Sequence, residues 1–147
     1  MISTTSKVAI STLEFSSSAP FYVIMEVYFF RGMNMKETVY FGTYTRRVSQ
    51  GIYKAEFDTE TGQLANLELF AAEPNPTYLA FDQYQHLYTV GSHDGKGGVA
   101  AYKIDGSLLN HVVEEGAPHC YVAVDEKRGL VYGANYHKGQ VLVYKRK

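Results

Sequence analysis

The 147-residue sequence has one cysteine, no tryptophan and almost no net charge. The single Cys120 excludes a framework of intrachain disulfides and is typical of a reducing compartment such as the cytoplasm. A formal net charge of −1 gives no electrostatic reason to expect nucleic acid or an anionic membrane as a partner. We therefore predict a cytoplasmic protein that binds neither, with Cys120 as a small buried apolar side chain.

Long apolar runs are also missing. The longest, FYVIMEVYFF at residues 21–30, is interrupted by Glu26 and is too short for a bilayer, which needs about 20 apolar residues. Lys7 lies too far before it, and Arg31 follows it directly, so it does not match a signal peptide. Residues 1–34 are thus an atypical extension: either an extra strand packed on the domain or, as we favour, sequence upstream of a native start at Met35.

The abundant residues favour strands. The chain is 46% hydrophobic and 20% charged, which is typical of a globular protein, and its length allows one domain with a core. Thirteen tyrosines and eight phenylalanines suit β-strands better than helices. No apolar stripe with a helical period of 3.6 residues occurs after Met35.

A repeat becomes visible when the chain is aligned with itself. Three segments match around a tyrosine that recurs 48 and then 44 residues further on, namely 38–45 (TVYFGTYT), 86–93 (HLYTVGSH) and 130–137 (LVYGANYH). A second column contains 51–58, 98–105 and 139–145, and a third contains 76–82 and 118–125, with one additional residue in the last copy. Repeats of about 40–50 residues with four strands each are typical of β-propeller blades, and the pattern excludes an α-solenoid.

The repeat predicts an all-β fold, a partial propeller. We expect three strands in residues 36–73, four in 76–113 and three in 118–145, which make about 2.5 four-stranded antiparallel blades. The domain would then extend over residues 35–147. Since the first blade lacks its inner strand and the last its outer strand, open sheet edges are expected, and such edges can self-associate.

Four motifs in order resemble the lactonase family. They are the GTYT…GIY start at 42–53, FDTETGQL at 57–64, NPTYLAFD at 75–82 and ANYHKGQVLVY at 134–144. The resemblance implies the N-terminal portion of a seven-bladed propeller of the 6-phosphogluconolactonase type. It further implies hydrolysis of a sugar lactone ester in the pentose phosphate route, without a cofactor or metal. Two alternatives remain: a non-catalytic β-repeat module that binds a partner, or an inactive fragment without a stable fold.

Lactone hydrolysis needs a base that activates water and hydrogen-bond donors that stabilise the oxyanion. A phosphorylated lactone also needs cationic side chains that bind its phosphate. His119 follows Pro118 at the start of a predicted inner strand and is the candidate general base or ligand-binding residue, although a structural histidine is the more common interpretation. Arg46 and Arg47, in a loop, are candidates for the phosphate or else solvated surface residues.

Asn135 and Tyr136, at the end of a strand, complete the substrate-binding candidates, although an asparagine there commonly forms an Asx turn. The five histidines are spread over different strands and turns, without zinc-ligand spacing, so no metal site is predicted. Each of Asp82, Asp105 and Asp125 ends a predicted strand, where a turn-forming aspartate is expected.

Overall fold

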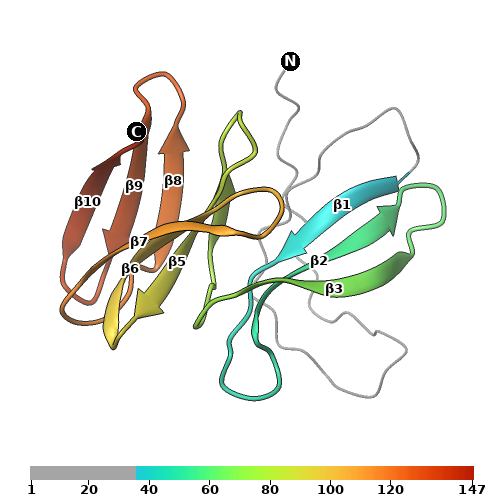
Figure 1. The fold of residues 1–147 in the computed structure, drawn as a ribbon, viewed down its shortest axis with the longest axis horizontal. Coiled ribbons are helices and arrows are strands. Elements are labelled where there is room, and N and C mark those ends of the chain that lie inside the picture. The colour runs from blue at the N-terminus through green and yellow to red at the C-terminus, as the bar shows by residue number, and fades with distance from the viewer. Residues whose placement is uncertain (1–35) are drawn as a thin grey trace.

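The computed structural model describes residues 36–147, and this part of the chain contains ten strands and no helix (Figure 1). The first sheet contains β1 (Lys36–Phe41), β2 (Gly51–Asp58) and β3 (Leu64–Ala72). The second contains β4 (Leu79–Phe81), β5 (Leu87–His93), β6 (Lys96–Tyr102) and β7 (Leu108–Glu114), and the third contains β8 (Tyr121–Asp125), β9 (Leu130–Asn135) and β10 (Gln140–Lys145).

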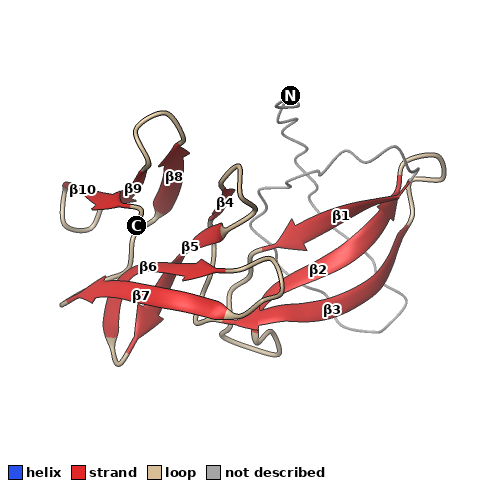
Figure 2. Cartoon of the chain, turned by 45° about the horizontal axis from the view of Figure 1, so that its top comes forward, coloured by secondary structure: helices blue, strands red, loops and turns tan. Residues whose placement is uncertain are grey.

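The fold is the predicted partial propeller. Each sheet is an antiparallel meander in sequence order, with β1-β2-β3, β4-β5-β6-β7 and β8-β9-β10 as hydrogen-bonded neighbours. The three sheets follow one another as successive blades (Figure 2), and β4 and β8, which contact one another, are edge strands of theirs. The strand numbers of three, four and three confirm the prediction from the repeat. The proposed extension at residues 1–34 lies outside the described residues.

The recurring tyrosine marks one face of each blade, because alternate residues of a strand share a face. Tyr40 packs in a core between the first and second sheets, with Ile52 and Leu87 fully buried beside it. Tyr88 packs in a second core between the second and third sheets, together with Val122. Successive blades are thus joined by apolar layers, and burial of each large side chain contributes about 1.5–3 kcal/mol.

The third sheet leaves its other face open to solvent. We call this the open face: Tyr121 and Val141 lie opposite Ala134 on either side of β9, and Val143 lies opposite Tyr132. Val141 is 70% exposed and Val143 is 57% exposed, although strands of this composition normally bury one side. The open face is where a following blade would pack in a closed propeller.

The turns at one end of the blades are built on the predicted aspartates. Oδ1 of Asp82 accepts hydrogen bonds from the backbone N–H groups of Tyr84 and His86, and Asp125 accepts one from Arg128 in the next blade. In both blades the other carboxylate oxygen, Oδ2, accepts a hydrogen bond from the hydroxyl of the recurring tyrosine. Tyr88 donates to Asp82 at 3.1 Å, and Tyr132 donates to Asp125 at 3.2 Å. The Asp–Tyr pair is therefore part of the repeat.

Asp82 also bonds to the next blade. Nη1 of Arg146, directly after β10, donates to Oδ2 of Asp82 at 2.8 Å, and its Nη2 donates to Glu126 at 2.9 Å. Burial alone would raise the pKa of Asp82, but the His86 and Arg146 hydrogen bonds outweigh it and hold that pKa below its ordinary value. The Asp82–Arg146 pair therefore fixes the second blade to the third.

Two expectations were wrong in detail. The first repeat segment was expected to be a strand through residue 45, but β1 ends at Phe41. Pro76 lies so close to Gly42 that a Cβ there would overlap the Pro76 carbonyl, and the chain turns away. Cys120 was expected to be buried but is exposed. Cys120 lies in the bend between the buried His119 and the start of β8, and its side chain faces solvent.

Candidate functional site

The predicted site residues gather at one end of the blades, opposite the aspartate turns. The loops that follow β1, β5 and β9 lie at this end, at the bottom of Figure 1. The connectors between blades, residues 73–78 and 115–120, reach the same end on their way to β4 and β8. In propellers, loops of this kind surround the mouth of the central channel.

The connectors lie against glycines of the preceding blade. A Cβ at Gly42 would overlap Pro76, and one at Gly97 would overlap the Ala117–Pro118 peptide. These positions need glycine because the backbone of the connector occupies the space of a side chain.

Asparagines tie the connectors to the loops. Asn75 and Thr45 exchange two hydrogen bonds: the Thr45 N–H donates to the Asn75 side chain at 3.1 Å, and the Asn75 N–H to the Thr45 hydroxyl at 3.2 Å. In the third blade, Nδ2 of Asn135 donates to the carbonyl of Ala117 at 2.8 Å, and its Oδ1 accepts the Lys138 N–H. Asn135 is buried, so its evident role is to hold the connector in place.

His119 is part of this connector, and it is only 2% exposed. The ring occupies the space above Gly133, where a Cβ would overlap it. Nε2 lies 2.5 Å from the hydroxyl of Tyr144 on β10, and Nδ1 is buried without a hydrogen-bond partner among residues 36–147. Burial lowers the pKa of His119; Glu114 opposes this shift and Lys138 adds to it. The imidazole is therefore neutral at pH 7.

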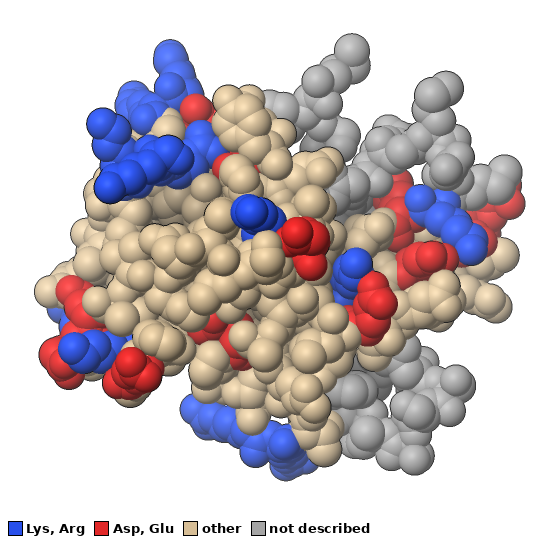
Figure 3. All heavy atoms as spheres, viewed as in Figure 1, with Lys and Arg blue, Asp and Glu red and all other residues tan. Residues whose placement is uncertain are grey.

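The other predicted residues are placed differently. Tyr136 is 75% exposed, and its ring lies 4.0 Å from that of His137. Arg46 is exposed, with its guanidinium 5.5 Å from the Tyr44 ring. Figure 3 shows basic side chains at the lower end, where the loop between β1 and β2 carries Arg46. The structure thus brings His119, on the second connector, and Asn135, at the end of β9, to the same place, whereas Arg46 belongs to the first blade.

A buried carboxylate that the sequence did not reveal lies at the start of the first connector. Glu73 has 0% exposed side-chain area. Its Oε2 accepts from Tyr102 at 2.5 Å and lies 2.8 Å from Nε2 of His111, and its Oε1 accepts the Ser92 N–H at 2.9 Å. Burial raises the pKa of Tyr102, and the Glu73 carboxylate raises it further. No local pattern marks this group, because its members lie on different strands.

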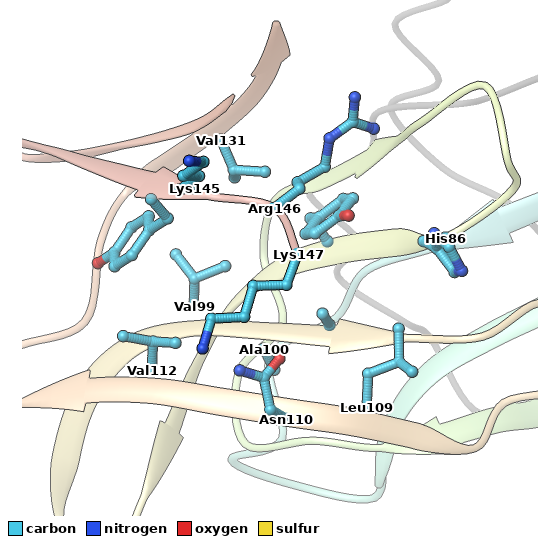
Figure 4. A pocket seen from close by; sticks show the side chains of 13 residues that line it. His86, Val99, Ala100, Leu109, Asn110, Val112, Val131, Lys145, Arg146 and Lys147 are labelled. Carbon is cyan, nitrogen blue, oxygen red and sulfur yellow. The ribbon is translucent and has the colours of Figure 1, made fainter. Parts of the chain in front are cut away.

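A hollow of about 560 Å³ is lined by residues of the second and third sheets, among them Tyr144 (Figure 4). Val99, Val112 and Val131 give it apolar walls, and Arg146 and Lys147 also line it. It opens beside β10, on the side where a fourth strand of the third blade would stand. None of the predicted site residues lines it.

Neither a metal cluster nor a membrane helix is found in the part of the chain that the structure describes. Within residues 36–147, no three His, Cys, Asp or Glu side chains are grouped so that they could hold a metal ion. Over the same residues no helix is long and apolar enough to span a bilayer.

Ten strands in antiparallel blades with a shared connector geometry define a β-propeller protein. A family model described as "Lactonase, 7-bladed beta-propeller" matches residues 38–147. The chain belongs to this lactonase family.

Relatives support the assignment. The chain is 51% identical to the uncharacterised protein YwcC of Lactococcus lactis over 76% of its own length and 33% of that protein. It is 46% identical to a Bacillus subtilis protein named 6-phosphogluconolactonase over 71% of its length and 32% of that protein. A crystal structure of a Lactobacillus plantarum protein superposes with a TM-score of 0.73 and 53% identity, over 76% of this chain and 33% of that one. The chain spans about a third of the length of these relatives.

Proposed function

We propose that this chain contributes blades to a cytoplasmic 6-phosphogluconolactonase-like enzyme that hydrolyses a phosphorylated sugar lactone. The observation that carries the proposal is the lactonase match over residues 38–147, together with a 46%-identical relative that bears the name 6-phosphogluconolactonase. The loops and connectors at one end of the blades are the proposed substrate side. No cofactor is part of the proposal.

In the reaction, water adds to the lactone carbonyl, and the ring C–O bond breaks to give a carboxylic acid and a hydroxyl group. A base takes the proton of the water, donors stabilise the oxyanion, and the leaving oxygen receives a proton. We assign His119 to the carbonyl end of the lactone, and the exposed Arg46 and Tyr136 to the phosphate and sugar. Asn135 acts by holding the His119 connector, since its own side chain is buried and bonded.

The test is turnover by the purified polypeptide, measured as acid release from 6-phosphogluconolactone above the spontaneous rate. Arg46→Ala should raise KM for the phosphorylated lactone several-fold and leave the KM for the unphosphorylated lactone unchanged, because the guanidinium meets the phosphate. Arg128→Ala, an exposed arginine in the turn between β8 and β9, is the matched control. A folded protein without turnover would refute the proposal for this chain.

A non-catalytic binding module is the second candidate, and the open face favours it. Val141 and Val143 are exposed on a sheet whose strand β10 has one edge unpaired within the described residues. Edge strands with apolar side chains bind other strands. An inert, stable protein that is recovered with a bound partner would support this candidate. A far-UV spectrum without β signal, with rapid proteolysis, would instead indicate an inactive fragment.

A further inference from the structure

The hollow of Figure 4 lies between the outer strands of the second and third sheets. Val99 of β6 and Val112 of β7 are partners in the second sheet and line one side of it. Val131 of β9 and Tyr144 of β10 are partners in the third sheet and line the other side. Val112 is 45% exposed, so solvent reaches the apolar walls. A hollow of about 560 Å³ with such walls has the size and character of a binding site.

Strand β10 borders this hollow with a free edge, and the second blade shows what such an edge binds. β6 and β10 belong to the same column of the sequence repeat, 98–105 and 139–145. β7 pairs with β6 over Gly97–Tyr102. β10 pairs with β9, and no strand of residues 36–147 pairs with its other edge. The unpaired N–H and C=O groups of a strand edge are best satisfied by another extended strand.

The charged residues that line the hollow are all of one sign. Among the described residues in its lining, Lys145, Arg146 and Lys147 are cationic and none is an aspartate or a glutamate. Arg146 is already bonded to Asp82 and Glu126, whereas the two lysines have no ion pair within residues 36–147. In Figure 4 the Lys147 side chain extends over the hollow in the direction of β7. The hollow is therefore complementary to a partner that combines apolar side chains with a carboxylate.

We propose that the outer edge of β10 and the hollow together bind an extended segment of another polypeptide, which adds to the third sheet as a strand. The segment has apolar residues at alternate positions and an acidic residue that pairs with Lys145. Main-chain hydrogen bonds to β10 attach it, and the apolar side chains that enter the hollow make the binding selective. This inference goes beyond the lactonase proposal, and it gives the binding-module candidate a place and a partner chemistry.

The alternation of β10 sets the pattern of the partner. Leu142 and Tyr144 are half-buried on the face towards the second sheet, whereas Val141, Val143 and Lys145 lie on the exposed face. Residues that are opposite one another on paired strands share a face, so the partner residues opposite Leu142 and Tyr144 enter the hollow beside its valines. The partner residue opposite Lys145 lies on the exposed face, where opposite charges on paired strands attract.

The probe is the end-blocked peptide EVTVTV, added to the ¹⁵N-labelled 147-residue protein and followed by NMR. Antiparallel to β10, it places its glutamate opposite Lys145 and two of its valines opposite Tyr144 and Leu142. Binding should be saturable, should slow the hydrogen exchange of the β10 amides on the free edge and should shift the signal of Val112. The peptide VVVETT, which has the same composition without the alternation, should bind much more weakly.

The charge pair is tested by exchange of the two signs. KVTVTV should bind the wild type about 2–30-fold more weakly than EVTVTV, because an attractive cross-strand pair becomes a repulsive one. Lys145→Glu should reverse this preference. Lys127→Glu changes an exposed lysine in the turn between β8 and β9, and this matched control should keep the wild-type preference.

The hollow is tested by a charge on its wall. Val112→Glu should weaken the binding of EVTVTV several-fold, whereas Leu108→Glu, on the same strand but outside the lining, should leave it unchanged. No saturable binding, or equal binding of EVTVTV and VVVETT, would overturn the inference. Slow exchange at β10 that depends on protein concentration without peptide would show that a second copy holds the edge, and would also overturn it. Lactone turnover is measured separately, so its absence refutes the proposed function alone.

Discussion

The Tyr102 hydroxyl donates a 2.5 Å hydrogen bond to Oε2 of Glu73, a carboxylate with no exposed side-chain area. Glu73 begins the connector that leaves the first blade, and Tyr102 ends β6 of the second. The pair therefore joins two blades through a charge that has been taken out of water. Such a charge is tolerated only where its oxygens are satisfied by hydrogen bonds.

Removal of the Tyr102 hydroxyl should destabilise the fold. Tyr102→Phe leaves the buried Glu73 carboxylate one donor short, and hydrogen bonds to charged groups are worth about 1.5–3 kcal/mol. The free energy of unfolding, from urea titration, should fall by that amount. Tyr132→Phe is the control, because its partner Asp125 lies in an exposed turn and the loss should be smaller. Equal losses would show that burial of Glu73 is not the cause.

Gly91 should be intolerant of a side chain because of the same carboxylate. A Cβ at Gly91 would overlap Oε1 of Glu73, whereas its backbone φ is not in the left-handed region. Gly91→Ala should therefore cost about 1–3 kcal/mol by overpacking. In a Glu73→Ala background the same change should cost much less, since the overlapping atoms are gone. Additive losses in the double-mutant cycle would contradict this explanation.

The Arg146–Asp82 contact should contribute more to the free energy of unfolding than the Arg128–Asp125 contact. Arg146→Ala removes a donor from an aspartate whose side chain is 1% exposed, and should lower the free energy of unfolding by about 1.5–3 kcal/mol. Arg128→Ala removes the corresponding partner of Asp125, but this arginine is in solvent, so little change is expected. The comparison fails if the two variants have the same chemical-denaturation midpoint.

His119 should make stability depend on pH below its ordinary pKa of about 6.5. Its pKa is lowered in the folded protein by burial, so between the two values the unfolded chain binds more protons than the folded one. Stability is therefore fully present above about pH 6.5 and declines as pH falls towards the folded pKa.

The measurement is the unfolding midpoint between pH 7.5 and 5. His119→Asn, which cannot be protonated in this range, should flatten the profile. Cys120→Ala alters the adjacent exposed side chain and should keep the wild-type slope. If the unfolding midpoint of His119→Asn depended on pH as in the wild type, other titrating groups would be the cause of the decline in stability.

The open face should make the protein associate with itself. Val141 and Val143 present an apolar surface beside the edge of β10 that no other strand of residues 36–147 pairs with. Val143→Lys should reduce concentration-dependent association in sedimentation velocity, because a charge on an edge strand opposes pairing. Val48→Lys changes a valine that is 65% exposed but lies in a loop, and should have no effect. Monomeric wild-type protein at all concentrations would contradict the prediction.

The sequence was sufficient for the blades but not for the contacts between them. The recurring tyrosine and the alternation around it predicted the strands and the sheets, because the period of a strand is local. The place of Cys120 was wrong because it was predicted from the residue type alone, whereas the residue lies in the bend before β8 and is exposed. Glu73 meets His111 across 38 positions and Tyr144 meets His119 across 25, and no local pattern encodes such pairs.

The site could be predicted only in part. Pro118 and the strand after it indicated where His119 would lie in the chain, and in the structure the residue lies directly before β8. Its burial, and the burial of Asn135, depend on the connector resting on glycines of other strands. Whether these residues act on a lactone stays a prediction.

The Arg146–Asp82 contact also has a consequence for synthesis. The two residues are 64 positions apart, and ribosomes add about 5–20 residues per second, so roughly 3–13 s pass between their additions to the chain. During that time the second blade has its apolar layer on one side only, and Asp82 lacks its guanidinium partner. During this interval chaperones and proteases have access to the uncovered face of the second blade, and the addition of Arg146 completes the contact with Asp82.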